Sequence, residues 1–300
     1  MKNILSFDVE DWQQSTLDLS LPITRRVVDN TARILDLCAA HHARGTFFVL
    51  GLVARAYPDL VRRIGAAGHE VALHGMDHAP VHVMTRDVFR ADVRQSRDLV
   101  EQAAGTAVAG YRAPDFSITS ESLWALQILA EEGFRYDSSL FPFAGRRYGI
   151  AESFPLPYRV LCGDAALVEF PLATTELLGR RVPAAGGGYF RLFPYAWHWR
   201  AVRRINRLGS PAMTYFHPYE IDADEIRLSP HRIPLRLRLS QGTGRRGLER
   251  RLARLLREFA WVPARDFIEE SAASLVAGRR LDLRGWPATP ARWDDAPETT

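Results

Sequence analysis

Short apolar runs alternate with helical patterns over the first two thirds of the chain. An apolar run bounded by turn residues is typical of a buried strand, and apolar residues that recur every three or four positions predict an amphipathic helix. We expect strands over residues 4–9, 46–50, 70–73, 108–111, 167–172 and 213–216. We expect helices over residues 24–40, 58–68 and 122–132, and a further helix that begins after the N-cap residue Thr85.

A strand followed by a helix, repeated along the chain, is the pattern of parallel strands joined by crossover helices. This repeat suits either a closed barrel or a doubly wound open sheet, and its spacing does not distinguish the two. After His217 the pattern changes to a Pro- and Arg-rich stretch and a basic helix. We therefore expect a catalytic core over residues 1–220, an appended region over 221–280 packed on it, and a poorly ordered tail over 281–300.

The composition is that of a globular protein, because 47% of the 300 residues are hydrophobic and 25% are charged. Acidic residues arrive before any apolar stretch long enough for a signal peptide, and no segment approaches the ~20 apolar residues of a membrane span. Cys38 and Cys162 form no CxxC pair, which fits a reducing compartment. We therefore expect a cytoplasmic protein without a transmembrane segment.

Arginines cluster at residues 245–257, where leucines recur at helical spacing. An amphipathic helix with a solvated basic face is the simplest interpretation, and contact with an acidic polymer, nucleic acid or membrane is the alternative. No motif supports nucleic-acid binding, so we expect none.

Ionisable residues lie at or just beyond the ends of the expected strands, where α/β enzymes place their sites. Asp8 and Glu10 point to the same side of the first strand, because strand side chains alternate between faces. Two carboxylates on one side are costly unless a cation or an arginine shares them. A metal explains the pair, and a polar strand end that caps the next turn through Asp11 is the alternative.

Two histidines, His74 and His78, follow the apolar run at residues 71–73. If the segment turns helically, side chains four residues apart share one face and can bind the same ion. Two imidazoles and one carboxylate would leave a coordination position for water, which is the arrangement of catalytic zinc. The site therefore predicts hydrolysis of an amide or ester. His217, at the end of another apolar run, is the candidate acid for the leaving amine, or else a turn histidine held by Pro218.

The motifs SFDVED, LHGMDH, GYRAPDFS, YDSS and FHP resemble, in order and spacing, the five motifs of the NodB-like polysaccharide deacetylases, carbohydrate esterase family four. The likeness extends from about Ile4 to Pro218. GGGYFRLFP at residues 186–194 and the helix LERRLARLLREF resemble more narrowly the exosortase-associated exopolysaccharide deacetylases. The resemblance implies a distorted (β/α) barrel of about seven strands, here with an appended C-terminal helical region, and a divalent metal, usually Zn²⁺.

By this resemblance Asp8 is the general base, His74 and His78 are metal ligands, and His217 is the general acid. Arg112 would hold Asp8 through a charge-assisted hydrogen bond that favours its ionised form. The chain departs from the family in the first motif, where Val9 separates two acidic residues that many members have side by side. We therefore expect Glu10 to be the third ligand, with Asp11 as the alternative.

The remaining expected site residues surround this centre. Pro114 and Asp115 would shape the groove wall, and Asp137 would close the far side and either orient His217 or contact Arg112. Aromatic residues near the motifs, Tyr111 and Tyr189 among them, could stack on sugar rings, although such residues more often pack in the core.

The expected function is removal of N-acetyl groups from an amino sugar in polysaccharide biosynthesis, and peripheral association with an assembly complex is left open. One alternative is the same site acting on a cyclic ureide, a formamide or an acetyl ester. Another is an inactive carbohydrate-binding or scaffold protein.

Overall fold

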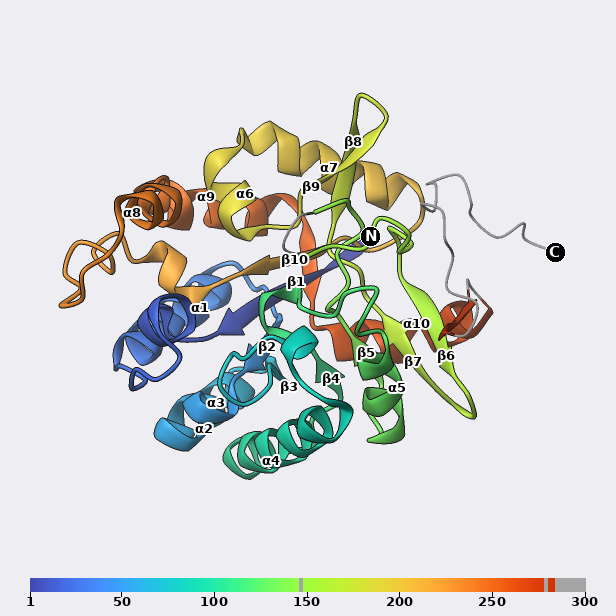
Figure 1. Ribbon diagram of the computed structural model, residues 1–300. Helices are drawn as coiled ribbons and strands as arrows, with labels where there is room; N and C mark the ends of the chain where they lie inside the picture. Colours follow the sequence, from blue (N-terminus) through green and yellow to red (C-terminus); the bar gives the residue numbers. More distant parts are fainter. Residues whose placement is uncertain (146–147, 278–279, 284–300) are drawn as a thin grey trace.

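The computed structural model describes residues 1–145, 148–277 and 280–283, and seven strands among these residues form the centre of the molecule (Figure 1). In order around the sheet they are β10 (Met213–Phe216), β1 (Lys2–Val9), β2 (Thr46–Val49), β3 (Glu70–Leu73), β4 (Gly110–Tyr111), β5 (Tyr136–Asp137) and β7 (Ala165–Glu169). All neighbours on this path are parallel. A parallel bridge between Leu172, just beyond β7, and Met213 joins the two ends of the path. The expected distorted barrel is therefore confirmed.

Further strands extend the sheet outside the barrel. β11 (Ala260–Val262) pairs with the first residues of β1, β6 (Tyr158–Cys162) runs antiparallel to β7, and β12 (Arg280–Asp282) pairs with β6. β8 (Thr174–Leu177) and β9 (Arg180–Pro183) form a separate hairpin.

Helices surround the barrel (Figure 1). They are α1 (Arg26–Ala40), α2 (Gly51–Ala56), α3 (Pro58–Ala66), α4 (Arg86–Ala104), α5 (Trp124–Glu131), α6 (Gly187–Leu192), α7 (Tyr195–Arg207), α8 (Leu235–Gly242), α9 (Arg245–Glu258) and α10 (Ala264–Ala277). Short helical turns occur at Gln13–Leu17, Val81–Val83, Pro114–Phe116 and Pro218–Ile221. The Thr85 hydroxyl accepts a hydrogen bond from Val88 N at the start of α4, as its N-cap position predicts. No helix in the described part of the chain is long and apolar enough to cross a membrane.

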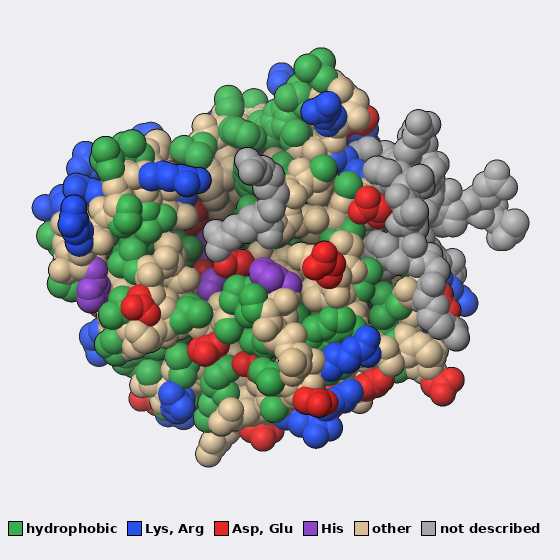
Figure 2. All heavy atoms as spheres, viewed as in Figure 1, with side chains coloured by type: hydrophobic (Ala, Val, Ile, Leu, Met, Phe, Trp, Pro, Cys, Tyr) green, Lys and Arg blue, Asp and Glu red, His purple; other side chains and the backbone are tan. Residues whose placement is uncertain are grey.

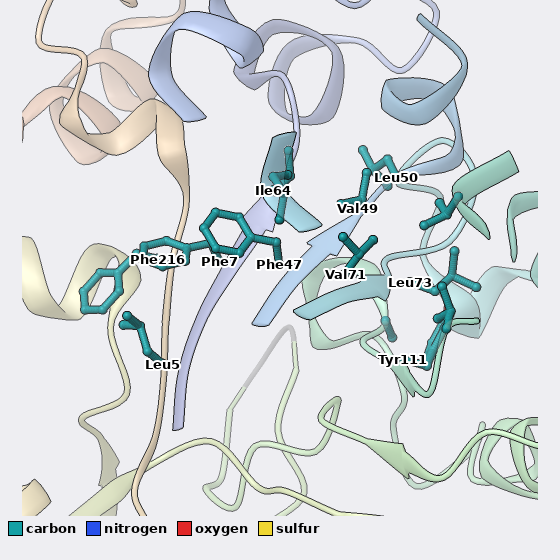
Figure 3. Packing of buried hydrophobic residues seen from close by; sticks show 14 of the residues in the cluster. Leu5, Phe7, Phe47, Val49, Leu50, Ile64, Val71, Leu73, Tyr111 and Phe216 are labelled. Atoms are coloured by element: carbon teal, nitrogen blue, oxygen red, sulfur yellow. The ribbon is translucent and has the colours of Figure 1, made fainter. Parts of the chain in front are cut away.

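Two apolar layers follow from the alternation of side chains along the strands. Leu5 and Phe7 of β1 face outward and pack, with Phe47 and Val71, under the helices (Figure 3). Ile4 faces inward, where a second cluster fills the barrel. Full burial of each such side chain contributes roughly 1.5–3 kcal/mol, so this double layer fixes which face of each strand is turned inward.

The amino ends of the strands are closed by the first residues of α10. Thr46 Oγ1 accepts a hydrogen bond from Ala264 N at 2.9 Å, and Glu70 Oε2 accepts one from Arg265 N at 3.0 Å. The Tyr136 hydroxyl donates to Glu70 Oε1, and burial raises the pKa of Glu70. A carboxyl group at a helix N-terminus meets free backbone N–H groups there. The start of α10 therefore covers the amino ends of β2 and β3.

The predicted boundaries of the core, the appended region and the tail remain predictions. Most of the predicted tail, residues 284–300, lies outside the described residues.

Candidate active site

A pocket of about 390 Å³ opens at the carboxyl ends of the strands. Asp8, Glu10, His74, His78 and His217 all line it, although they come from three separate segments of the chain. Figure 2 shows histidine and acidic side chains next to one another near the middle of this face. The convergence expected from the ends of the strands is therefore present in the structure.

Three of these side chains form a cluster that could hold a metal ion. Ligand atoms of Glu10, His74 and His78 all lie within 4.8 Å of one another, and all three residues are buried. His74 Nδ1 lies 2.8 Å from the carbonyl oxygen of Arg112. A ring that donates from Nδ1 keeps a lone pair on Nε2, so this contact selects the tautomer a metal ligand needs.

The loop between the histidines is not the helical turn that the sequence led us to expect. Gly75 has φ 79° and His78 has φ 71°, so the chain bends through two left-handed residues after β3. The side-chain amide of Gln14 donates to Asp77 O at 2.7 Å and supports the bend. The two imidazoles meet because of this tight loop, with ring centroids 5.6 Å apart.

The donor set fits a divalent metal. Glu10 Oε2 lies 2.6 Å from His78 Nε2, yet this buried oxygen has no partner with hydrogen-bond geometry. Two ligand atoms that lie this close without hydrogen-bond geometry are placed as two ligands of one ion would be. Although burial opposes both charges, the attraction between the two groups lowers the pKa of Glu10 and raises that of His78. Two imidazoles with one carboxylate make the donor set of catalytic zinc.

Asp11, the alternative third ligand, has a different role. Its Oδ1 accepts hydrogen bonds from Gln13 N and Gln14 N, and its Oδ2 accepts from the amide and hydroxyl of Thr24. Asp11 therefore caps the turn after β1, and the structure brings Glu10 to the histidines instead.

Asp8 is held from inside the barrel by Arg112, which is fully buried. Arg112 Nη1 donates to Asp8 Oδ1 at 2.7 Å and to the Ser6 hydroxyl at 2.8 Å. Its Nε and Nη2 donate to the carbonyl and hydroxyl oxygens of Ser138, and its guanidinium lies 4.1 Å from the Phe48 ring centroid. This arrangement fixes the Asp8 carboxylate in the pocket lining, through the hydrogen bond with Arg112 that the family resemblance implies.

His217 lies beside the same carboxylates. Its Nε2 is 3.1 Å from Glu10 Oε1 and 3.9 Å from Asp8 Oδ2, and its Nδ1 is 3.2 Å from Glu220 Oε2. Burial favours the neutral ring, but the hydrogen bonds with Glu10 and Glu220 outweigh it and raise the pKa of His217 to about 10. The carboxylates on both sides of the ring therefore favour its charged form.

The other predicted site residues divide into two groups. Asp115 and Tyr189 line the pocket, and Pro114 is buried in the short turn that carries Asp115. Tyr111 is not part of the pocket lining, because it points outward from β4 and packs between Phe89 and Phe134. The prediction that Tyr111 contacts substrate is therefore corrected, and Tyr111 is a core residue.

Asp137 also differs from its prediction. Its oxygens accept hydrogen bonds from the amide and hydroxyl of Ser139, and its carboxyl neighbour is Glu169. Burial raises the pKa of Asp137, and no described contact joins it to His217. Its charge interaction with Arg112 is a minor influence. Asp137 therefore shapes the chain after β5, and the carboxylate in contact with His217 Nδ1 is that of Glu220.

Glu220 and its partner Arg191 were missed in the sequence. Glu220 follows His217 by three residues, and Pro218 opens the helical turn between them, which is the spacing of a capping box. This spacing is a signal that could have found Glu220. Arg191 lies 29 positions away along the chain, and no local pattern pairs the two.

Comparisons with known proteins divide the chain into two matched regions. Residues 6–136 match a family model described as polysaccharide deacetylase, and residues 138–269 match a domain of unknown function, DUF3473. A chitooligosaccharide deacetylase of Rhizobium leguminosarum bv. trifolii is 37% identical over 73 residues, 24% of this chain and 34% of that protein. A peptidoglycan-N-acetylglucosamine deacetylase of Bacillus cereus is 31% identical over 98 residues, 32% of this chain and 36% of that protein. The matches thus span about a third of these relatives.

Solved structures share the whole architecture. A candidate polysaccharide deacetylase from Mycobacterium smegmatis superposes with a TM-score of 0.62 at 23% identity, over 99% of this chain and 94% of that one. PuuE allantoinase superposes with a TM-score of 0.60 at 17% identity, over 91% of each chain. At these identities the likeness establishes the (β/α) barrel fold.

Proposed function

We propose that the chain is a member of the polysaccharide deacetylase family, whose model matches residues 6–136, and that it is a metal-dependent hydrolase that removes N-acetyl groups from an amino sugar in bacterial exopolysaccharide biosynthesis. The observation that carries the proposal is the meeting of Glu10, His74 and His78 beside Asp8 and His217 in one pocket. The relatives named for chitooligosaccharides and peptidoglycan N-acetylglucosamine support the substrate class. The DUF3473 match, which marks the exopolysaccharide deacetylase subgroup, supports the biosynthetic context.

Glu10, His74 and His78 would hold the divalent metal, and the donor set favours zinc. Bound there, the ion would supply Lewis acidity toward the amide carbonyl and toward the attacking water. Asp8 accepts a proton from the attacking water, and Arg112 keeps its carboxylate in place during that transfer.

His217 supplies the second proton transfer of the reaction, the one to the leaving nitrogen. An amine leaves poorly as its anion, so the nitrogen must gain a proton as the carbon–nitrogen bond breaks. His217 Nε2, which faces Asp8 and Glu10, donates that proton. The products are acetate and the free amino sugar.

The test combines metal analysis with acetate release from triacetylchitotriose. We expect His78→Ala to lose both metal and turnover, because it removes a ligand. Asp8→Asn should retain the metal and lose roughly 10²–10⁴-fold in turnover, the usual contribution of a general base. His82→Ala, at an exposed histidine outside the pocket, is the matched control and should retain both.

The same experiment separates the competing functions. Full activity of Asp8→Asn would exclude its assignment as the base. A native protein that binds no metal and releases no acetate from triacetylchitotriose would contradict the deacetylase assignment altogether. Turnover of a cyclic ureide, a formamide or an acetyl ester in preference to the sugar would assign another substrate class to the site.

A further inference from the structure

A buried ion pair lies directly behind His217. Glu220 is 1% exposed and Arg191 is 5% exposed, and Arg191 Nε donates to Glu220 Oε1 at 2.7 Å. The other carboxylate oxygen, Oε2, accepts from the backbone N–H of His217 at 3.1 Å and lies 3.2 Å from its Nδ1. The pair therefore reaches the imidazole on the edge opposite to the pocket centre.

We propose that Glu220, held by Arg191, is the positioning residue of His217, and that the DUF3473 region thereby supplies the support for the acid of the reaction. This inference rests on the proposed function.

The first argument concerns the direction of the ring. Because Glu220 Oε2 can only accept a hydrogen bond from Nδ1, the contact turns Nε2 toward Glu10 and Asp8. Tyr219 stacks on His217 with ring centroids 4.7 Å apart and planes 14° apart, which removes rotation out of that plane. The ring therefore presents Nε2 to the pocket before and after it gives up a proton.

The second argument concerns what holds Glu220. Arg191 Nη1 donates to the carbonyl oxygens of Gln241 and Thr243, at 3.1 and 2.7 Å, and lies 3.5 Å from that of Ser240. These carbonyls lie at the C-terminal end of α8, where a helix leaves acceptors unpaired. Arg191 thus joins the site to α8 and cannot swing away from Glu220 without losing these bonds.

All of these supporting residues lie outside the segment that matches the polysaccharide deacetylase model, which ends at residue 136. Arg191, Glu220 and the end of α8 lie within the DUF3473 match at residues 138–269. The metal cluster and the base therefore come from the first region, and the positioned acid comes from the second.

The alternative is that Glu220 has only a structural role, since its Oε2 also caps the turn Pro218–Ile221 by accepting a hydrogen bond from His217 N. The two roles predict different effects when Glu220 is replaced. Loss of a cap lowers stability and acts on every substrate alike. Loss of positioning acts only where the leaving group needs a proton.

The test therefore compares two substrates with different leaving groups in the zinc-loaded protein. Triacetylchitotriose releases an amine, which must be protonated, and 4-nitrophenyl acetate releases a stable phenolate, which need not be. We expect Glu220→Gln to lower kcat on the sugar at least about 10-fold and to change ester turnover by less than about 3-fold. Glu225→Gln, at a buried glutamate outside the pocket lining, is the matched control and should keep both rates.

Glu220→Asp guards against misfolding of the first variant, because it keeps the charge that Arg191 requires and shortens the reach to Nδ1. It too should lose sugar turnover preferentially. In a His217→Ala background, Glu220→Gln should lower sugar turnover no further, because a positioning residue acts through the ring that it holds.

Equal losses on both substrates, or a further loss in the His217→Ala background, would overturn the positioning role while leaving the deacetylase assignment intact. A native protein that fails on triacetylchitotriose but cleaves the ester would overturn both.

Discussion

Arg112 is the clearest place to perturb the barrel interior, because its guanidinium is fully buried and donates to Asp8 at 2.7 Å. Arg112→Met keeps an apolar stem beside Phe48 and leaves the Asp8 carboxylate buried without its cation. The hydroxyls of Ser6 and Ser138 keep second partners, the carbonyls of Thr214 and Phe170, so the unpaired carboxylate dominates the loss.

Removing one partner of a buried ion pair costs about 3–5 kcal/mol, a large part of a total unfolding free energy of roughly 5–15 kcal/mol. Urea denaturation of the metal-free proteins, followed by tryptophan fluorescence, measures this loss. Asp8→Asn combined with Arg112→Met should be at least about 1 kcal/mol more stable than Arg112→Met alone, because no charge is left unpaired. Arg63→Met, at a surface pair with Asp36, should cause no measurable change.

The reasoning fails if Arg112→Met loses less than about 1 kcal/mol, or if the double variant is no more stable than the single one. Either result would mean that water or a rearranged neighbour replaces the guanidinium, and that Arg112 does not hold Asp8 in the way its contacts indicate.

Three further predictions concern residues around the pocket. Burial and the nearby Asp77 raise the pKa of Asp92 from 3.8 to about 7. Because the folded state then binds this proton more tightly than the unfolded state, the free energy of unfolding should fall as pH rises from about 4 to about 7. Asp92→Asn should abolish that fall and gain no more than about 4 kcal/mol at pH 8, as measured by urea denaturation at several pH values. Gly186→Ala should lower the melting temperature by several degrees, because its Cβ would lie 1.8 Å from Tyr215 O, whereas Gly188→Ala, with its nearest neighbour at 3.6 Å, should not. Tyr189→Ala should raise KM for triacetylchitotriose several-fold, and Tyr111→Phe should leave it unchanged, since Tyr189 lines the pocket and Tyr111 lies in the core.

The local pattern of the sequence was sufficient for most of the barrel. The strands predicted over 70–73 and 213–216 have those bounds in the structure, and the helix after Thr85 begins at Arg86. Each prediction succeeded because a run of apolar residues and its flanking turn signals are neighbours in the chain. The closure of the barrel between Leu172 and Met213 depends on a distant pairing, which no local pattern encodes.

The candidate site shows the same division. Glu10 and His74 could be predicted because each follows a strand directly, and His78 lies in the same short loop as His74; parallel strands bring such ends together. Tyr111 was misassigned because a strand of two residues gives no alternation from which to read its face. For Asp137 the sequence left open a contact with His217 or with Arg112, and Glu220 makes the contact with His217; both are acids near strand ends, and only the fold decides which one reaches the imidazole.

The place of β1 in the sheet constrains how the protein is made. Although it precedes the other strands in the sequence, it pairs along one edge with Met213–Phe216, and the first residues of its other edge pair with Ala260–Val262. The rest of that second edge can join β2 early, but the pairings with β10 and β11 must wait until these later segments have been synthesised. The nascent chain therefore carries an unpaired apolar strand edge until β10 has been synthesised, and during that time chaperones that shield such edges should influence its yield.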